Sequence, residues 1–239
     1  MRIFSILVVI IMMLQTIYCQ SVIKSKHDLS SGNTGATKWQ STNETQVCIF
    51  CHTPHTPKGA IMPLWNKIKP TNTTFSVYSS STMDASAGSD LNGSYSLLCL
   101  SCHDGSTPMN DLLSPSGVGK PLMAGGYTKL GDVYYPGSPF ARFPGANIGE
   151  GYGGSEGRDL TNDHPVNIVY DASHPGVTKG KLYNPESQSS GLGGTVKEKM
   201  LFNNKVECPS CHNPHNPSIF PFLRKTTDNG TLCVTCHNK

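Results

Sequence analysis

Cysteine and histidine recur together four times in this sequence, always as Cys-x-x-Cys-His, at residues 48–52, 99–103, 208–212 and 233–237. Two thiols at this spacing add to the two vinyl groups on one edge of a porphyrin, and the imidazole that follows lies under the iron as an axial ligand. The motifs therefore predict four covalently bound haem c groups. The predicted attachment residues are Cys48, Cys51, Cys99, Cys102, Cys208, Cys211, Cys233 and Cys236, and the predicted proximal iron ligands are His52, His103, His212 and His237.

Other uses of paired cysteines explain the pattern less well. Zinc sites also contain Cys-x-x-Cys pairs, but they give no reason for histidine to follow the second cysteine in every copy. A thioredoxin-like redox site requires a βαβ context, which the sequence does not show. Disulfides are common in exported proteins, but eight of the nine cysteines belong to the four motifs.

Five histidines remain outside the motifs: His27, His55, His164, His174 and His215. A single isolated histidine more often has a structural role, but four haems with two imidazole ligands each require four further histidines. We expect the distal ligands to be His27, His55, His164 and His215. His174 is uncertain, and we expect it to be the surplus histidine because it has no counterpart in the internal repeat.

Two of the expected distal ligands, His55 and His215, stand three residues after a proximal histidine, in His52-Thr-Pro-His55 and His212-Asn-Pro-His215. So short a tether keeps the second imidazole on the proximal side of its own porphyrin. We therefore expect each to ligate the iron of a neighbouring haem and to hold two haems close together.

The order of these parts repeats, which divides the chain into a first half (about 20–110) and a second half (about 160–239). Each half has a leading histidine, then CxxCHxPH, then a second CxxCH. Residues 111–159 form a Gly/Pro-rich connection, and we expect residues 20–239 to form one tetrahaem domain with two haem-pair modules.

The expected fold is mostly coil around the haems, with short helices near the motifs and few short strands. Residues 71–94 and 114–158 are rich in Ser, Thr, Asn, Gly or Pro, which favours loops over helices. Residues 166–170 (Val-Asn-Ile-Val-Tyr) predict a short strand. Apolar side chains make up only 36% of the sequence, so we expect the haems themselves to fill much of the interior.

Residues 1–19 predict a signal peptide, because Arg2 precedes an apolar stretch, Ile3–Leu14, that is too short to span a bilayer. Cleavage after Cys19 is expected, and acylation of Cys19 is the alternative, which the bulky Tyr18 disfavours. No later run is long enough to cross a membrane. We therefore expect an exported chain with no membrane span after cleavage.

The formal charge of +3 does not indicate a nucleic-acid partner, because no basic cluster interleaved with aromatic residues accompanies it. Each haem also carries two propionates. With Arg2 removed and four oxidised haems bound, the net charge becomes roughly −2.

The ordered surroundings of the motifs resemble multihaem cytochromes with doubled CxxCH motifs, and most closely the tetrahaem extracellular cytochromes of the OmcE type. The resembling segments are His27–Ser30, Gln46–His55, Pro63–Trp65, Tyr78–Asp84, Leu98–Gly105, Asp163–Val166 and Cys208–Asn216. This resemblance implies bis-His ligation of all four haems and polymerisation of copies of the chain into head-to-tail filaments. It also implies that one distal histidine is donated by a neighbouring subunit.

Two functions follow from these features, and sequence alone separates them poorly. The first is extracellular electron transfer as the subunit of a filament, with other cytochromes or extracellular acceptors as redox partners. The second is a soluble periplasmic shuttle that delivers electrons to a reductase. An enzyme, such as a multihaem nitrite or hydroxylamine oxidoreductase, is disfavoured because such a haem needs an open or unusual axial position and no CxxCK motif is present.

Overall fold

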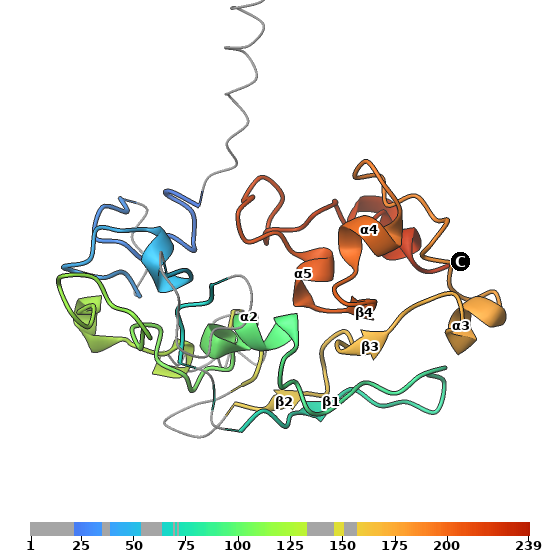
Figure 1. Ribbon diagram of the computed structural model, residues 1–239, viewed down its shortest axis with the longest axis horizontal. Helices are drawn as coiled ribbons and strands as arrows, with labels where there is room; N and C mark the ends of the chain where they lie inside the picture. Colours follow the sequence, from blue (N-terminus) through green and yellow to red (C-terminus); the bar gives the residue numbers. More distant parts are fainter. Residues whose placement is uncertain are drawn as a thin grey trace, which may run out of the picture.

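A computed structural model describes residues 22–34, 39–53, 64–68, 70, 72–132, 146–150 and 157–239. The predicted signal peptide, Cys19 and His55 lie outside these residues. The described chain is mostly coil, as predicted, with short helices and two small sheets (Figure 1). The α-helices are α2 (Tyr95–His103), α3 (Pro175–Thr178), α4 (Val196–Met200) and α5 (Cys208–Cys211). The 3-10 helices are η2 (Cys48–Phe50), η3 (Ala124–Gly126), η4 (Leu130–Asp132), η5 (Asp228–Gly230) and η6 (Cys233–Thr235).

Every CxxCH motif lies on one of these short helices. The first begins η2, the second forms the end of α2, the third forms α5 and the fourth begins η6. Helical backbone is suited to this task, because residues three apart lie on one face of a helix and both cysteines of a motif then point to the same side. The expectation of short helices near the motifs is confirmed.

The two sheets have two strands each. β1 (Ser76–Val77) pairs in parallel with β2 (Asp159–Leu160), and β3 (Ile168–Val169) pairs antiparallel with β4 (Lys205–Val206). The strand predicted within residues 166–170 is present as β3. Figure 1 shows β1 and β2 below α2, while β3 and β4 lie beside α5, so the sheets link segments far apart in the sequence.

Buried apolar side chains form three small clusters. The first contains Phe75, Leu91, Leu97, Leu100 and Leu160. The second contains Tyr170, Val196, Met200, Leu223 and Leu232, and the third contains Ile49, Phe50 and Met123. The three clusters are separate from one another, so protein side chains do not form one continuous core among the described residues.

Helices α2 and α5 join the two halves of the chain. The Ser96 hydroxyl donates a hydrogen bond to the buried Glu207 carboxylate and accepts one, at 3.0 Å, from the backbone N–H of Cys208. The Glu207 N–H donates to Ser210 Oγ at 2.9 Å. Burial raises the pKa of Glu207, and the hydrogen bonds from Ser96 oppose that rise. The second and third motifs are therefore held side by side.

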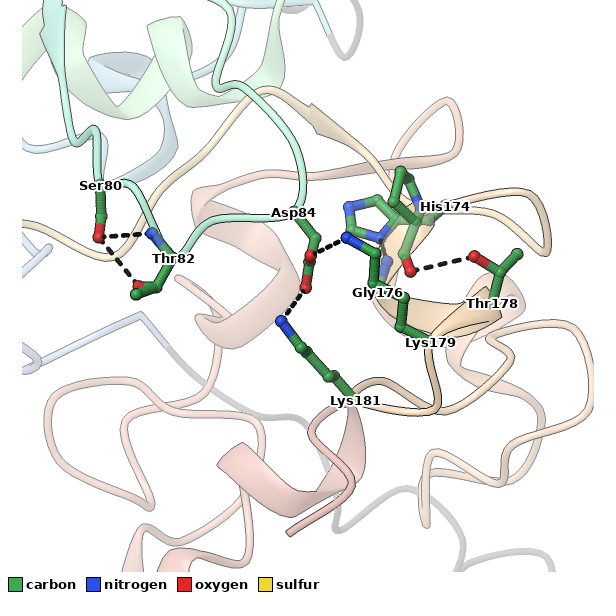
Figure 2. A network of polar contacts seen from close by, with 9 residues as sticks. Ser80, Thr82, Asp84, His174, Gly176, Thr178, Lys179 and Lys181 are labelled. Carbon is green, nitrogen blue, oxygen red and sulfur yellow. Dashed lines mark hydrogen bonds and ion pairs between the residues drawn. The ribbon is translucent and has the colours of Figure 1, made fainter.

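A second junction connects the loop after β1 with α3 (Figure 2). Asp84 accepts Lys179 Nζ at 2.6 Å and Lys181 Nζ at 2.8 Å. The two lysine hydrogen bonds lower the pKa of Asp84 to about 2. We call these three residues the Asp84 ion-pair cluster.

Candidate haem-binding centre

None of the eight motif cysteines, all of which lie among the described residues, forms a disulfide. Burial raises the pKa of Cys51 to about 12 and the pKa values of Cys211 and Cys236 to about 11. These thiols are protonated near neutral pH and lie in apolar surroundings. Such surroundings suit thioether bonds to a porphyrin edge, which carry no charge.

Thiols of successive motifs lie close enough to shift one another's pKa. After burial, Cys102 is the next cause of the raised pKa of Cys51, which places the first motif beside the second. A hydrogen bond with Cys208 raises the pKa of Cys99 and places the second motif beside the third. Cys233 contributes to the raised pKa of Cys211, behind burial and Cys208, so the fourth motif follows. Each attachment site therefore lies near the next one in the sequence.

Three pairs of imidazole rings lie beside each other, two of them edge-on and one nearly parallel. The pairs are His27 with His103, His52 with His215, and His164 with His237. Ring centres are 6.0 Å apart in the first two pairs and 6.3 Å apart in the third. Each pair joins one predicted proximal ligand to one predicted distal ligand.

This spacing fits a six-coordinate iron between the rings. Two metal–imidazole bonds of about 2.0 Å and two steps of about 1.1 Å from ring centre to nitrogen give a separation of about 6.2 Å. Aromatic rings in direct contact also have centres about 4.5–7 Å apart, so the assignment depends on the pairing of a predicted proximal with a predicted distal histidine in all three cases. The residues present therefore fit a bis-His haem at each of the three pairs.

The hydrogen bonds of the Nδ1 atoms support the same interpretation. The Nδ1 atoms of His27, His103, His164 and His212 lie 3.4, 2.5, 3.0 and 2.9 Å from the carbonyl oxygens of Pro214, Ala146, Pro165 and Pro221. Because a carbonyl only accepts hydrogen bonds, each Nδ1 carries the proton and each Nε2 keeps a free lone pair. Metal-ligating histidines are held in this way by backbone carbonyls or carboxylates.

His27 also meets the second requirement of a ligand, which is a neutral ring. Burial, followed by the nearby His103, lowers the pKa of His27 to about 4. Its ring stacks on Phe222 with centres 4.3 Å apart. Phe222 of the second half therefore fixes the orientation of a histidine of the first half.

His174 has the opposite arrangement. The N–H of Gly176 donates to His174 Nδ1 at 2.9 Å, so this nitrogen has no proton, and the buried ring caps the N-terminus of α3 (Figure 2). Tyr170 packs edge-on against the ring, with centres 5.8 Å apart. His174 therefore has a structural task in α3, which favours its assignment as the surplus histidine.

The pairing follows the internal repeat. In each half the leading histidine, His27 or His164, faces the proximal histidine of the second motif of the same half. His215 instead faces His52 of the other half, so it reaches a neighbouring site rather than its own. His55 lies outside the described residues.

The sequence pointed to Pro63–Trp65 only as part of the resemblance, and it gave no role to Asn66, which supports the first motif. The Asn66 side chain, which is fully buried, donates to the carbonyls of Ile49 at 2.8 Å and Ser114 at 3.0 Å. The Trp65 ring lies edge-on to His52 with centres 6.2 Å apart, and its Nε1 donates to Ser101 at 3.0 Å. No periodicity marks Asn66, because its role depends on contacts distant in the sequence.

A family model described as the doubled CXXCH motif matches residues 200–239, which contain the third and fourth motifs. No curated protein matches the chain. The doubled motif indicates covalently bound haem c and supports a multihaem c-type cytochrome that transfers electrons. In the described part of the chain, no helix is both long and apolar enough to cross a membrane.

Proposed function

We propose that this chain is a tetrahaem c-type cytochrome that transfers electrons outside the cell as the subunit of a polymeric filament. The observation that carries the electron-transfer role is the set of three facing imidazole pairs at 6.0 to 6.3 Å. Two imidazoles per iron leave no coordination position for a substrate, which favours an electron carrier over an enzyme. When bound, haem c supplies a one-electron Fe(III)/Fe(II) couple.

The residues of the chain have three tasks in this proposal. The motif cysteines hold the porphyrins covalently, and the facing histidines close both axial positions. The carbonyls at Pro214, Ala146, Pro165 and Pro221 orient four of the imidazoles through Nδ1. The α2–α5 junction keeps the second and third attachment sites in contact, and short separations between redox centres favour rapid electron transfer.

The proximity of each attachment site to the next supports a conduit, because neighbouring sites allow electrons to pass from haem to haem. The resemblance in motif order to filament-forming cytochromes supports polymerisation of copies of the chain. An interface that joins the last site of one copy to the first site of the next is head-to-tail, and nothing forces such an interface to close into a ring.

The alternative is a soluble periplasmic shuttle, which one observation favours. The three described imidazole pairs are complete within a single chain. A ligand from a neighbouring subunit would therefore be needed only at the site of His212, and only if His55 does not fill it. Cytochromes of the c type are typically exported, which is compatible with both functions.

Electron cryomicroscopy of the secreted, haem-staining fraction separates the two functions. The filament proposal expects uniform filaments whose density fits this chain, with a continuous row of haems through every interface. Discrete particles of single-chain mass, stable on dilution and confined to the periplasm, would instead establish the shuttle. A five-coordinate, high-spin haem in the native protein would contradict both.

A further inference from the structure

A buried lysine lies near both the first and the second attachment site, since its charge acts on Cys51 and on Cys102. Lys67 is only 1% exposed, and its Nζ donates a hydrogen bond to the carbonyl of Pro108 at 2.7 Å. None of the ion pairs found among the described residues involves Lys67. A buried ammonium without a neutralising carboxylate is unusual, because moving a charge out of water is costly.

The backbone of residues 64–68 fixes where this charge lies. The N–H of Asn66 donates to the carbonyl of Cys51 at 2.8 Å, and Lys67 forms an antiparallel bridge with Leu112. In such extended backbone the side chains of Trp65 and Lys67 leave on the same face. Trp65 on that face already contacts Ser101, the neighbour of Cys102. The segment is thus bonded to the first motif and directs its alternate side chains toward the second.

Electrostatics agree with this placement. Burial is the main cause of the raised pKa values of Cys51 and Cys102, and the positive charge of Lys67 opposes the rise at both thiols. Asp104, which is also buried, acts on Cys102 in the opposite direction and ranks behind Lys67. Its carboxylate is already hydrogen-bonded to Ser106 and Thr107.

We propose that the buried charge of Lys67 raises the reduction potentials of the haems attached at the first and second motifs. Reduction of each iron from Fe(III) to Fe(II) adds one electron and removes one positive charge. A nearby ammonium in a low-dielectric interior favours the less positive state, so it favours reduction. The inference rests on the proposed haem attachment at Cys48/Cys51 and Cys99/Cys102.

Electron transfer from the other two haems toward the first and second sites therefore becomes more favourable. Raised potentials at the first and second sites make this end of the chain the preferred location of electrons. Buried charges are screened little by salt, so the effect persists at high ionic strength. An exposed lysine such as Lys120, with 61% of its side chain accessible, has no comparable effect.

The test is a spectroelectrochemical titration of the holoprotein, with dithionite as the reductant, for wild type, Lys67→Met and Lys67→Gln. Lys67→Gln keeps a donor for the Pro108 carbonyl but removes the charge. In both variants we expect the midpoint potentials of two of the four one-electron transitions to fall by about 59 mV each. This shift corresponds to a roughly tenfold lower equilibrium constant for reduction. Lys120→Met is the matched control and leaves all four unchanged.

Unchanged potentials in either neutral variant would overturn the proposal, as would an equal shift of all four transitions. Loss of haem from both neutral variants would overturn it too, because Lys67 would then be a structural residue. A pyridine haemochrome assay of the wild type is made first. If the wild type carried no covalent haem, the proposed function would fail before Lys67 was tested.

Discussion

The direction of one hydrogen bond distinguishes His164 from His174. His164 and His174 are both histidines of the second half and each precedes a proline. The Nδ1 of His164 faces a carbonyl and therefore carries a proton, whereas the Nδ1 of His174 accepts from a backbone N–H. Only the first arrangement leaves Nε2 free for a metal, so the ring tautomer separates a ligand from a helix cap.

We predict that His215→Ala converts one haem, the one held by His52, from low spin to high spin. All four haems stay covalently attached, because the cysteines are unchanged. Absorption and electron paramagnetic resonance spectra check the spin state, and the haem count checks attachment. A fully low-spin spectrum of the variant would show that His215 is not a ligand.

His174→Ala is the matched control for that variant. It removes the side-chain cap of α3 and lowers the unfolding free energy by about 1 kcal/mol, the usual effect of losing an N-cap. The spin state of all four haems is expected to stay the same. A high-spin haem in this variant would instead assign His174 as a ligand.

How much of the site could be predicted depends on the range of the contacts involved. The attachment residues follow from local spacing, and the surplus of His174 follows from its place outside the repeat. The partner of His215 could not be derived, because the pairing with His52 spans the two halves of the chain. Lys67 and Asn66 were missed for the same reason, since their partners Pro108 and Ser114 lie about 40 to 50 residues away.

At the scale of elements, the sequence predicted the positions of the helices better than their packing. The motif helices and the strand β3 follow from local signals, whereas the parallel pairing of β1 with β2 joins residues 76–77 to residues 159–160. Two-residue strands carry too little local pattern to reveal a partner. Packing of this kind depends on close approaches that only the folded chain shows.

One close approach predicts a sensitive glycine beside α2. A Cβ at Gly149 would lie 2.7 Å from the backbone of both Asp104 and Gly157. The N–H groups of Ile148 and Gly149 bond to the carbonyl of His103, at 2.9 and 3.0 Å. We expect Gly149→Ala to displace this loop and to lower the unfolding free energy by about 1–3 kcal/mol.

Thermal unfolding of the holoprotein measures this loss. Gly117→Ala is the matched control, because a Cβ there meets nothing within 4 Å and the backbone φ is ordinary. Equal stability of the two variants would mean that the loop of Gly149 moves freely away from α2.

The Asp84 ion-pair cluster predicts a pH dependence of stability. The pKa of Asp84 is lowered from 3.8 to about 2 by the two lysines, so folding favours the ionised form. This contribution is fully present above the unfolded value of 3.8 and is lost as the pH falls through about 2. We expect Asp84→Asn to lower the melting temperature at pH 7, and the difference from wild type to vanish by about pH 2.

Melting curves of both proteins from pH 7 to pH 2 provide the comparison. Asp111→Asn breaks the pair of Asp111 with the exposed Lys120 and should have little effect, as is usual for solvent-exposed ion pairs. A constant difference between wild type and Asp84→Asn across this range would contradict the assignment.

At the scale of the whole molecule, the proposed haems would connect parts that apolar side chains alone connect weakly. The three apolar clusters contain only five, five and three buried residues among those described, and they are separate from one another. The His52–His215 pair and the α2–α5 junction bridge the two halves. In the proposed tetrahaem protein, iron ligation by His52 and His215 would supply a cross-link between the halves that a continuous hydrophobic core would otherwise provide.

We predict that the haem-free chain does not fold to a compact state. Residues 20–239, produced in a reducing cytosol where haem is not attached, lack the groups that fill the space between the clusters. For 220 residues the radius of gyration is about 17 Å for a compact fold and about 51 Å for an unfolded chain. Small-angle X-ray scattering should give a value far above the compact one, and heating should produce no cooperative transition by circular dichroism. The purified holoprotein is the control, with the compact value and a cooperative transition. A compact apoprotein that unfolds cooperatively would show instead that the three clusters suffice, and that the haems are held by an interior formed before attachment.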